Sequence, residues 1–139
     1  MEAIEFNVLG KPIPKQRPRK GKYGNIYTPT KTKNYEELIG MSFKLNAGSG
    51  FKPFESHVTL TIINVCKFPK KFNKEQRERA SSGSIRPVSR PDIDNIIKSV
   101  MDGLNGVAFK DDSQVVNITA GKIYGNENYI QIIVKGDNQ

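Results

Sequence analysis

The chain of 139 residues is 36% hydrophobic and 26% charged, and its 22 Lys and Arg residues against 14 Asp and Glu residues give a formal net charge of +8. A chain of this length buries roughly two-thirds of its unfolded surface in one core, so we expect a single domain over residues 1–139. No apolar run approaches the roughly 20 residues of a membrane span, and residues 1–10 lack the regions of a signal peptide, which argues against a membrane protein and predicts a cytoplasmic one.

Residues 2–9 alternate between apolar and polar side chains, which predicts a half-buried strand that ends at Gly10. Residues 10–29 contain four prolines and three glycines, so we expect a basic Pro/Gly-rich loop without regular structure. Eight cations and no acid lie between residues 10 and 33. Tyr23 and Tyr27 are interspersed among these cations, a composition suited to phosphate contact and base stacking; a solvated loop that binds nothing is the alternative.

Residues 32–47 are predicted to form a helix, with Glu36 and Glu37 in its first turn. The positions that recur at three- and four-residue spacing are Tyr35, Leu38, Ile39, Ser42 and Leu45, all of them apolar or aromatic except Ser42.

Residues 57–68 are rich in β-branched side chains and are predicted to form a strand with a bulge or strong twist near Asn64, where the apolar alternation shifts. The single His57 and the single Cys66 lie in this run, and we expect both to be structural. One cysteine and one histidine cannot form an internal disulfide or a Cys/His zinc cluster, which leaves little basis for either kind of site.

Residues 67–90 hold eight further cations against two acids. Asn73 and Gln76 have the spacing of a capping box, which predicts a short basic helix over residues 74–81 that ends before Gly83. This helix has little apolar surface to bury. It is therefore either exposed against a polyanion or a mobile excursion.

After Pro91, the spacing of Ile96, Val100 and Leu104 predicts an amphipathic helix that Gly103 and Gly106 terminate. Asp94, Lys98 and Asp102 form a charged stripe beside this apolar arc. Two strands follow, joined by residues 125–128 as a hairpin. In the first, Val116, Ile118 and Ala120 alternate with the residues between them, and in the second, Ile130, Ile132 and Val134 face inward. The predicted fold class is α+β, with a small mixed or mainly antiparallel sheet of about four strands packed by two main helices.

Five of the 14 acidic residues lie within residues 90–114, against the positive field of the rest of the chain. Asp92 and Asp94 can converge on one cation from extended backbone, and a third carboxylate would come from Asp111 or Asp112. Mg²⁺ suits such a site, and Lys98 could stabilise a substrate phosphate. The alternative is that these aspartates are helix caps and turn residues and that Asp94 and Lys98 form an exposed pair.

Carboxylates flanked by cation-rich segments provide what phosphodiester hydrolysis needs, because cations hold the DNA backbone while a metal activates water and stabilises the leaving oxygen. A non-catalytic basic nucleic-acid-binding module is the alternative function. A nuclease with a broader selectivity for branched DNA is a third.

The run RPDIDNIIKSVMDGLNGVAFKDDSQV closely resembles the signature of the RusA-type Holliday junction resolvases, which occur in bacteria and often in prophages. The opening strand, the run GKPIPKQRPR and a YTP-containing segment before a helix are similar to the start of that family. The resemblance therefore covers most of the chain, and residues 67–89 are its least diagnostic part.

The resemblance implies a homodimeric endonuclease with an α+β fold that uses Mg²⁺, or Mn²⁺ as a substitute, to nick four-way DNA junctions symmetrically in recombination and repair. It assigns the catalytic and metal-binding carboxylates to Asp92, Asp94 and Asp112, with Asp111 as the less favoured substitute for Asp112, and the essential lysine to Lys98. Asp102 would then be structural or support the ligands. The cations expected to hold DNA are Lys15, Arg17, Arg19, Lys20, Lys70, Lys71, Arg77, Arg79 and Arg90.

Overall fold

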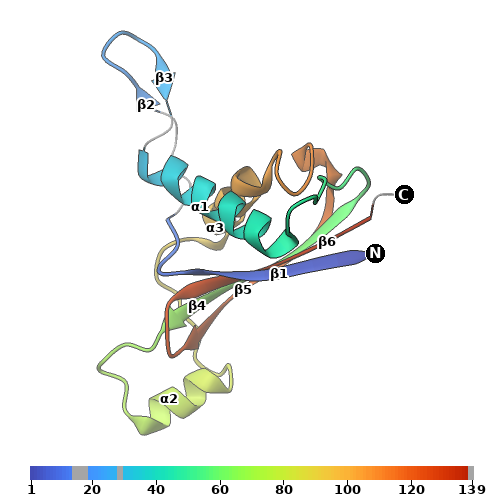
Figure 1. Ribbon diagram of the computed structural model, residues 1–139. Coiled ribbons are helices and arrows are strands. Elements are labelled where there is room, and N and C mark those ends of the chain that lie inside the picture. The colour runs from blue at the N-terminus through green and yellow to red at the C-terminus, as the bar shows by residue number, and fades with distance from the viewer. Residues whose placement is uncertain (14–18, 28–29, 138–139) are drawn as a thin grey trace.

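The computed structural model describes residues 1–13, 19–27 and 30–137 and contains helices and strands that agree with the predicted α+β class (Figure 1). Its elements are β1 (Glu2–Leu9), β2 (Arg19–Lys20), β3 (Ile26–Tyr27), α1 (Thr30–Ala47), β4 (Val58–Lys67), α2 (Lys74–Ser81), α3 (Ile93–Leu104), a 3₁₀ turn (Asp112–Gln114), β5 (Val115–Gly125) and β6 (Tyr129–Gly136).

The main sheet has the strand order β1-β6-β4-β5, in which β4 and β5 are parallel and the other neighbours are antiparallel. The expected hairpin between the last two strands is therefore wrong, because β4 lies between β5 and β6. The connection between them crosses the end of β4, where the Lys67 amide donates to Asn128 Oδ1 at 2.9 Å and the Phe68 amide donates to the Gly125 carbonyl at 3.0 Å. The short connection suggested a hairpin, but the largely buried strand β4 lies between the two strands and pairs with both.

The predicted bulge lies in a different strand. β4 pairs without interruption from Thr59 onward, and Asn64 is a buried residue on its inner face. The register shifts instead where Val58 pairs with Val115 and Thr59 pairs with Asn117, so Val116 is the extra residue. Because of this bulge Val116 is exposed and falls out of the expected alternation with Ile118 and Ala120.

The helices α1 and α3 cover the same face of the sheet, and one hydrophobic core lies between the two layers (Figure 1). In α1 the buried residues include Tyr35, Ile39 and Phe43, whereas Leu38 and Leu45, both expected to be buried, are exposed. The helix begins at Thr30, so its first turn holds no acidic residue and the expected position of two glutamates in that turn is wrong. The weak apolar periodicity of this helix misled the face assignment.

The two helices meet closely where Gly40 of α1 and Gly103 of α3 lie. A Cβ on Gly103 would be 2.8 Å from the Glu36 carbonyl oxygen and 2.9 Å from the Ile39 Cβ, and one on Gly40 would be 2.9 Å from the Gly103 carbonyl oxygen. Gly103 is therefore a packing residue within α3 and not a helix terminator, as the sequence suggested. Gly106, with a φ of 79°, follows the end of the helix.

Two segments project from the body, one above the helices and one below the sheet in the view of Figure 1. One is the β2–β3 hairpin, which forms within the stretch expected to be irregular. The other is α2, whose predicted bounds and capping box are confirmed: the Gln76 amide donates to Asn73 Oδ1 at 2.8 Å, and the Asn73 amide donates to Gln76 Oε1 at 2.9 Å. Among the described residues, no helix has the length and apolar character needed to cross a membrane.

Candidate functional site

The N-terminal end of α3 carries the first pair of predicted site residues. Asp92 occupies the N-cap position after a cis Arg90–Pro91 peptide bond, but its side chain makes no capping hydrogen bond. Asp94 lies in the first helical turn and is exposed. A cleft of about 370 Å³ at this end is lined by Arg90, Pro91, Asp92 and Asn95. The Asp92 carboxylate is therefore not committed to the helix and faces a space open to solvent.

Lys122 of β5 anchors the segment that leads into α3. Its Nζ donates to the carbonyl oxygens of Ser89 at 2.5 Å and Pro91 at 3.1 Å. Arg86 Nε donates in turn to the Lys122 carbonyl oxygen at 3.1 Å. The backbone immediately before Asp92 is thus fixed to the sheet by one strand residue, which no sequence pattern had identified.

The second pair of candidate residues, Asp111 and Asp112, lies in a turn that Gln114 holds in place. Gln114 Nε2 donates to the carbonyl oxygens of Phe54 at 2.7 Å and Ser56 at 2.9 Å, and its Oε1 accepts from the amides of Lys110 at 2.8 Å and Asp111 at 3.0 Å. All the hydrogen-bonding capacity of this amide is used. The spacing of Asp111 and Gln114 is that of a capping box, a signal that would have identified Gln114 from the sequence.

The two aspartates of this turn differ in what their carboxylates do. Asp111 Oδ2 accepts from the Ser113 amide at 3.0 Å, and the hydrogen bonds to Ser113 lower the pKa of Asp111. Asp112 has a raised pKa, first because burial disfavours its charged form and then because the carboxylates of Asp102 and Asp111 repel it. Its Oδ1 is buried and has no hydrogen-bond partner among the described residues. Asp111 is a capping residue, whereas Asp112 has an unsatisfied anionic oxygen.

Within the described residues, no three Asp, Glu, His or Cys side chains are gathered closely enough to hold a metal ion. Asp94 and Asp102 are both on α3, but two turns of helix, about 12 Å, separate their positions. Asp112 has Asp102 as its strongest charged neighbour. The structure therefore brings Asp112 near a carboxylate that the sequence had placed in a supporting role.

Lys98 is exposed on α3 between Asp94 and Asp102. It forms no ion pair with Asp94 in the part of the chain that the structure describes; an ion pair that does occur there joins Lys110 and Glu55, both exposed, at 3.0 Å. The alternative in which Asp94 and Lys98 form an exposed ion pair is thus not seen among the described residues. The Lys98 ammonium remains accessible from solvent.

The predicted DNA-contacting cations lie mainly in the two projecting segments. Lys20 is exposed in β2, Arg90 is exposed at the cleft, and four others are exposed on or just before α2: Lys70, Lys71, Arg77 and Arg79. Lys15 and Arg17 lie outside the described residues, and only the backbone of Arg19 is described, in β2. Of these described cations, Arg90 lies at the cleft beside Asp92, and the others lie in or just before the two projecting segments.

Aromatic rings attach α2 to the sheet. The ring of Tyr124 in β5 stacks on Phe68 at a centroid distance of 6.2 Å and meets Phe72 edge to face at 5.4 Å. The Arg77 guanidinium lies 5.8 Å from the centre of the Phe68 ring. In the hairpin, Lys22 Nζ lies 6.0 Å from the centre of the exposed Tyr23 ring. These contacts attach α2 and the residues before it to the sheet, which argues against a mobile excursion; exposure of α2 against a polyanion stays a prediction.

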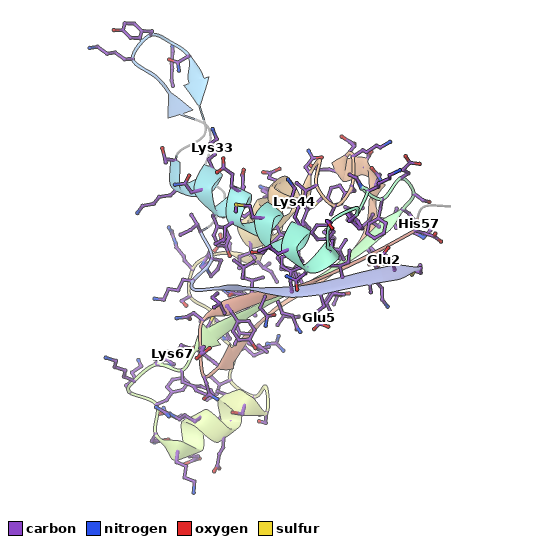
Figure 2. All side chains as sticks on the ribbon, viewed as in Figure 1. Glu2, Glu5, Lys33, Lys44, His57 and Lys67 are labelled. Atoms are coloured by element: carbon purple, nitrogen blue, oxygen red, sulfur yellow. The ribbon has the colours of Figure 1, made fainter. Side chains whose placement is uncertain are left out.

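His57 and Cys66 lie where structural roles were expected. His57 is at the end of β4 opposite Lys67 and contacts Ser56 Oγ at 3.4 Å (Figure 2). Burial raises the pKa of the Cys66 thiol, although nearby Lys122 and Lys11 partly oppose the effect. Asn64, 1% exposed, has no hydrogen-bond partner for its amide among the described residues.

Comparison with known proteins shows the family to which the chain belongs. The family model described as "Endodeoxyribonuclease RusA" matches residues 10–135. The chain is also 30% identical over 143 residues to "Uncharacterized protein YqaN" of Bacillus subtilis (strain 168), a match that covers 97% of each chain. A family match over nearly the whole chain, with the aspartates of α3 and of the Asp111–Asp112 turn inside it, confirms the resemblance seen in the sequence: the chain belongs to the RusA family of endodeoxyribonucleases.

Proposed function

We propose that this protein is a Mg²⁺-dependent endonuclease that acts as a homodimer in the cytoplasm and resolves four-way DNA junctions during recombination and repair. The chain would act as one domain over residues 1–139. The observation that carries the proposal is Asp112, whose anionic oxygen is buried without a partner beside two further carboxylates in a family of nucleases. Such an arrangement is unfavourable unless a cation or a proton neutralises it.

The residues proposed to hold the cation are Asp92, Asp94 and Asp112. Carboxylate oxygens are the ligands that Mg²⁺ prefers, Asp92 is free of capping bonds, and Asp112 has an unsatisfied oxygen, so the donor set fits the ion. Asp111 fits less well because its carboxylate already caps the turn. When bound, the cation would activate water and stabilise the leaving oxygen of a phosphodiester.

The carboxylates are not gathered within the described chain, so the proposal requires them to come together when the cation and DNA bind. This requirement can be measured. Mg²⁺ affinity should be weak for the protein alone and should rise when junction DNA is present, with Asp112→Asn reducing the increase. An affinity that is unchanged by DNA and by this substitution would contradict the assignment of Asp112.

The remaining roles belong to cations of the chain. Lys98 is accessible on the same stripe as Asp94 and would stabilise charge that develops on the scissile phosphate. The exposed cations of α2, including Arg77 and Arg79, and Lys20 of β2 would hold the phosphates of the junction arms. Because these contacts are electrostatic, the affinity for DNA should fall steeply as salt rises.

The decisive experiment compares Asp94→Asn with the parent on a labelled four-way junction. We expect the variant to bind the junction with near-parent affinity and to lose cleavage in Mg²⁺ by about a thousandfold, a loss typical of removing one key catalytic group. Glu75→Gln removes an exposed carboxylate from α2 and serves as the matched control, which should cleave normally. Cleavage by Asp94→Asn at the parent rate would show that the mechanism is wrong.

The same assay with duplex DNA, branched DNA and hairpin RNA separates the proposed junction resolvase from the two alternative functions. Cleavage of several branched DNAs at similar rates would favour a nuclease with broader selectivity. Binding to every substrate without cleavage of any, with and without Mg²⁺, would favour a non-catalytic binding module. This second function is tested because the described residues contain no preassembled site of three carboxylates.

A further inference from the structure

The solvent-facing side of α1 carries a stripe of large apolar side chains. Leu38, Met41 and Leu45 are 45%, 62% and 82% exposed. Their spacing places them on one side of the helix, away from the buried Tyr35, Ile39 and Phe43 that contact the core. A helix on the surface of a monomer normally has one apolar face, and one that is apolar on two faces normally has a contact for each.

Two grooves run beside this stripe. One, of about 430 Å³, lies between α1 and α3 and includes Glu37, Gly40, Met41 and Lys44 in its lining. The other, of about 500 Å³, continues from Lys44 and Leu45 toward the residues that follow α1. A ridge of apolar side chains next to a groove floored partly by glycine is the surface that a second helix fits.

The charges beside the stripe select the partner. Glu37 and Lys44 are exposed on the same side of α1, to either side of Met41 along the helix; the position of Lys44, with Lys33 nearer the helix start, can be followed in Figure 2. If a second α1 lies antiparallel across a two-fold axis near Met41, Leu38 meets the partner's Leu45 and Glu37 meets the partner's Lys44. The surface is complementary to itself in both shape and charge, as an isologous interface must be.

We propose that the outer face of α1, defined by Glu37, Leu38, Met41, Lys44 and Leu45, is the surface through which two copies of this chain associate. The inference deepens the homodimeric function proposed above and rests on it for the number of copies. DNA suits this face poorly, because three of its five residues are apolar and the charge of Lys44 is balanced by that of Glu37, so the face has no net positive charge for a phosphate backbone. The contact is centred on one helix, so the dimer should dissociate on dilution.

Sedimentation equilibrium of the full chain, without DNA or metal, tests the proposal. Over a roughly hundredfold concentration range the parent should convert from monomer to dimer, and Leu38→Ser/Leu45→Ser should raise the dissociation constant by about tenfold or more. Val88→Ser removes an apolar side chain that is 95% exposed outside α1 and should leave it unchanged. A parent that stays monomeric, or a dimer that the double substitution leaves intact, would overturn the proposal.

Charge reversal tests the two-fold arrangement itself. Glu37→Lys and Lys44→Glu should each weaken association, and the double variant should restore it, because Glu37 and Lys44 are two turns apart within one helix and can meet only across the axis. Failure of the double variant to recover association would contradict the antiparallel register. These residues are exposed, so near-parent circular dichroism and Tm are expected for all variants.

A cysteine at the axis gives a measurement that does not depend on weakening anything. Met41→Cys in a Cys66→Ser background should form a disulfide-linked dimer under mild oxidation, whereas a Val88→Cys control in that background should not. Absence of the Met41→Cys dimer would also count against the proposal. All these readouts precede DNA cleavage, so the two proposals can fail separately. A dimer that does not cut junctions would refute the proposed nuclease activity and leave the interface standing. A monomer that cuts junctions would refute the interface and the homodimeric part of the proposed function and leave the nuclease activity standing.

Discussion

The ammonium nitrogen of Lys122 lies 3.1 Å from the carbonyl oxygen of Pro91, so a strand residue holds the backbone directly before Asp92. The same nitrogen contacts the Ser89 carbonyl oxygen, and the Lys122 carbonyl oxygen accepts from Arg86. Sheet and site are therefore joined by a reciprocal set of hydrogen bonds across a sequence separation of more than thirty residues. The position of Asp92 depends on β5 as much as on its own helix.

Lys122→Met should reduce junction cleavage by about tenfold while leaving junction binding close to that of the parent, because the segment before Asp92 loses its anchor but no proposed DNA contact is removed. We expect a higher Mg²⁺ concentration for half-maximal rate and a loss of about 1 kcal/mol in the free energy of unfolding. Lys110→Met, which breaks an exposed ion pair, is the matched control and should change neither rate nor stability appreciably. Equal cleavage by the two variants would show that Lys122 does not position the site.

Asp112→Asn should be more stable than the parent at pH 7 although it loses cleavage. The pKa of Asp112 is higher in the folded protein than its unfolded value of 3.8. Asp112 therefore causes no loss of stability below pH 3.8, and its ionisation destabilises the folded protein as the pH rises through the folded-state pKa. Asparagine has no such loss. Tm measured between roughly pH 3 and pH 7 should therefore show a gain for the variant that disappears on the acid side.

Asp111→Asn is the natural comparison because its carboxylate behaves in the opposite way. Hydrogen bonds to Ser113 lower the pKa of Asp111, so its charged form contributes stability above the unfolded value of 3.8 and this contribution is lost as the pH falls through the folded value. Asp111→Asn should not gain stability at pH 7. A gain for Asp111→Asn equal to that for Asp112→Asn would mean that general charge reduction, and not the burial of Asp112, is responsible.

Gly103→Ala should lower the free energy of unfolding by about 1–3 kcal/mol, because the added methyl group would press on the Glu36 carbonyl and on Ile39 where α1 and α3 cross. Urea or thermal unfolding measures the loss. Gly121→Ala, whose added carbon would meet the end of the Arg86 side chain at 3.4 Å and Ile63 Cδ1 at 3.8 Å, should cost less. The reverse order would show that the two helices can separate without penalty.

Asn73→Ala should loosen α2 by removing its capping box, at a local cost of about 1 kcal/mol. The main unfolding transition should change little, because α2 buries little apolar surface and only Ala80 of its residues is buried. Junction affinity should fall, and the salt dependence of binding should become shallower as the phosphate contacts of α2 weaken. Asn117→Ala, in an exposed position of β5, should leave both measurements unaltered.

The amino-acid sequence by itself determined the features that depend on near neighbours. The capping box at Asn73, the alternation of β1 and the apolar arc of α3 around Ile96 and Val100 all follow from local spacing. The family signature around Asp92 and Asp94 also lies in one continuous run, and the family match confirms it. These predictions needed no knowledge of how distant segments meet.

Only the tertiary structure decided which distant residues share a surface. In the fold, β5 is an edge strand beside β4, and its Lys122 donates a hydrogen bond to the Pro91 carbonyl oxygen. No local sequence pattern encodes this contact. The preference proposed for Asp112 over Asp111 as a metal ligand likewise rests on which carboxylate oxygen the fold buries without a partner among the described residues. The burial of Asp112, its repulsion by Asp102, and the choice of which face of α1 packs on the core all depend on segments far apart in the chain. This is the physical reason that local spacing could not determine them.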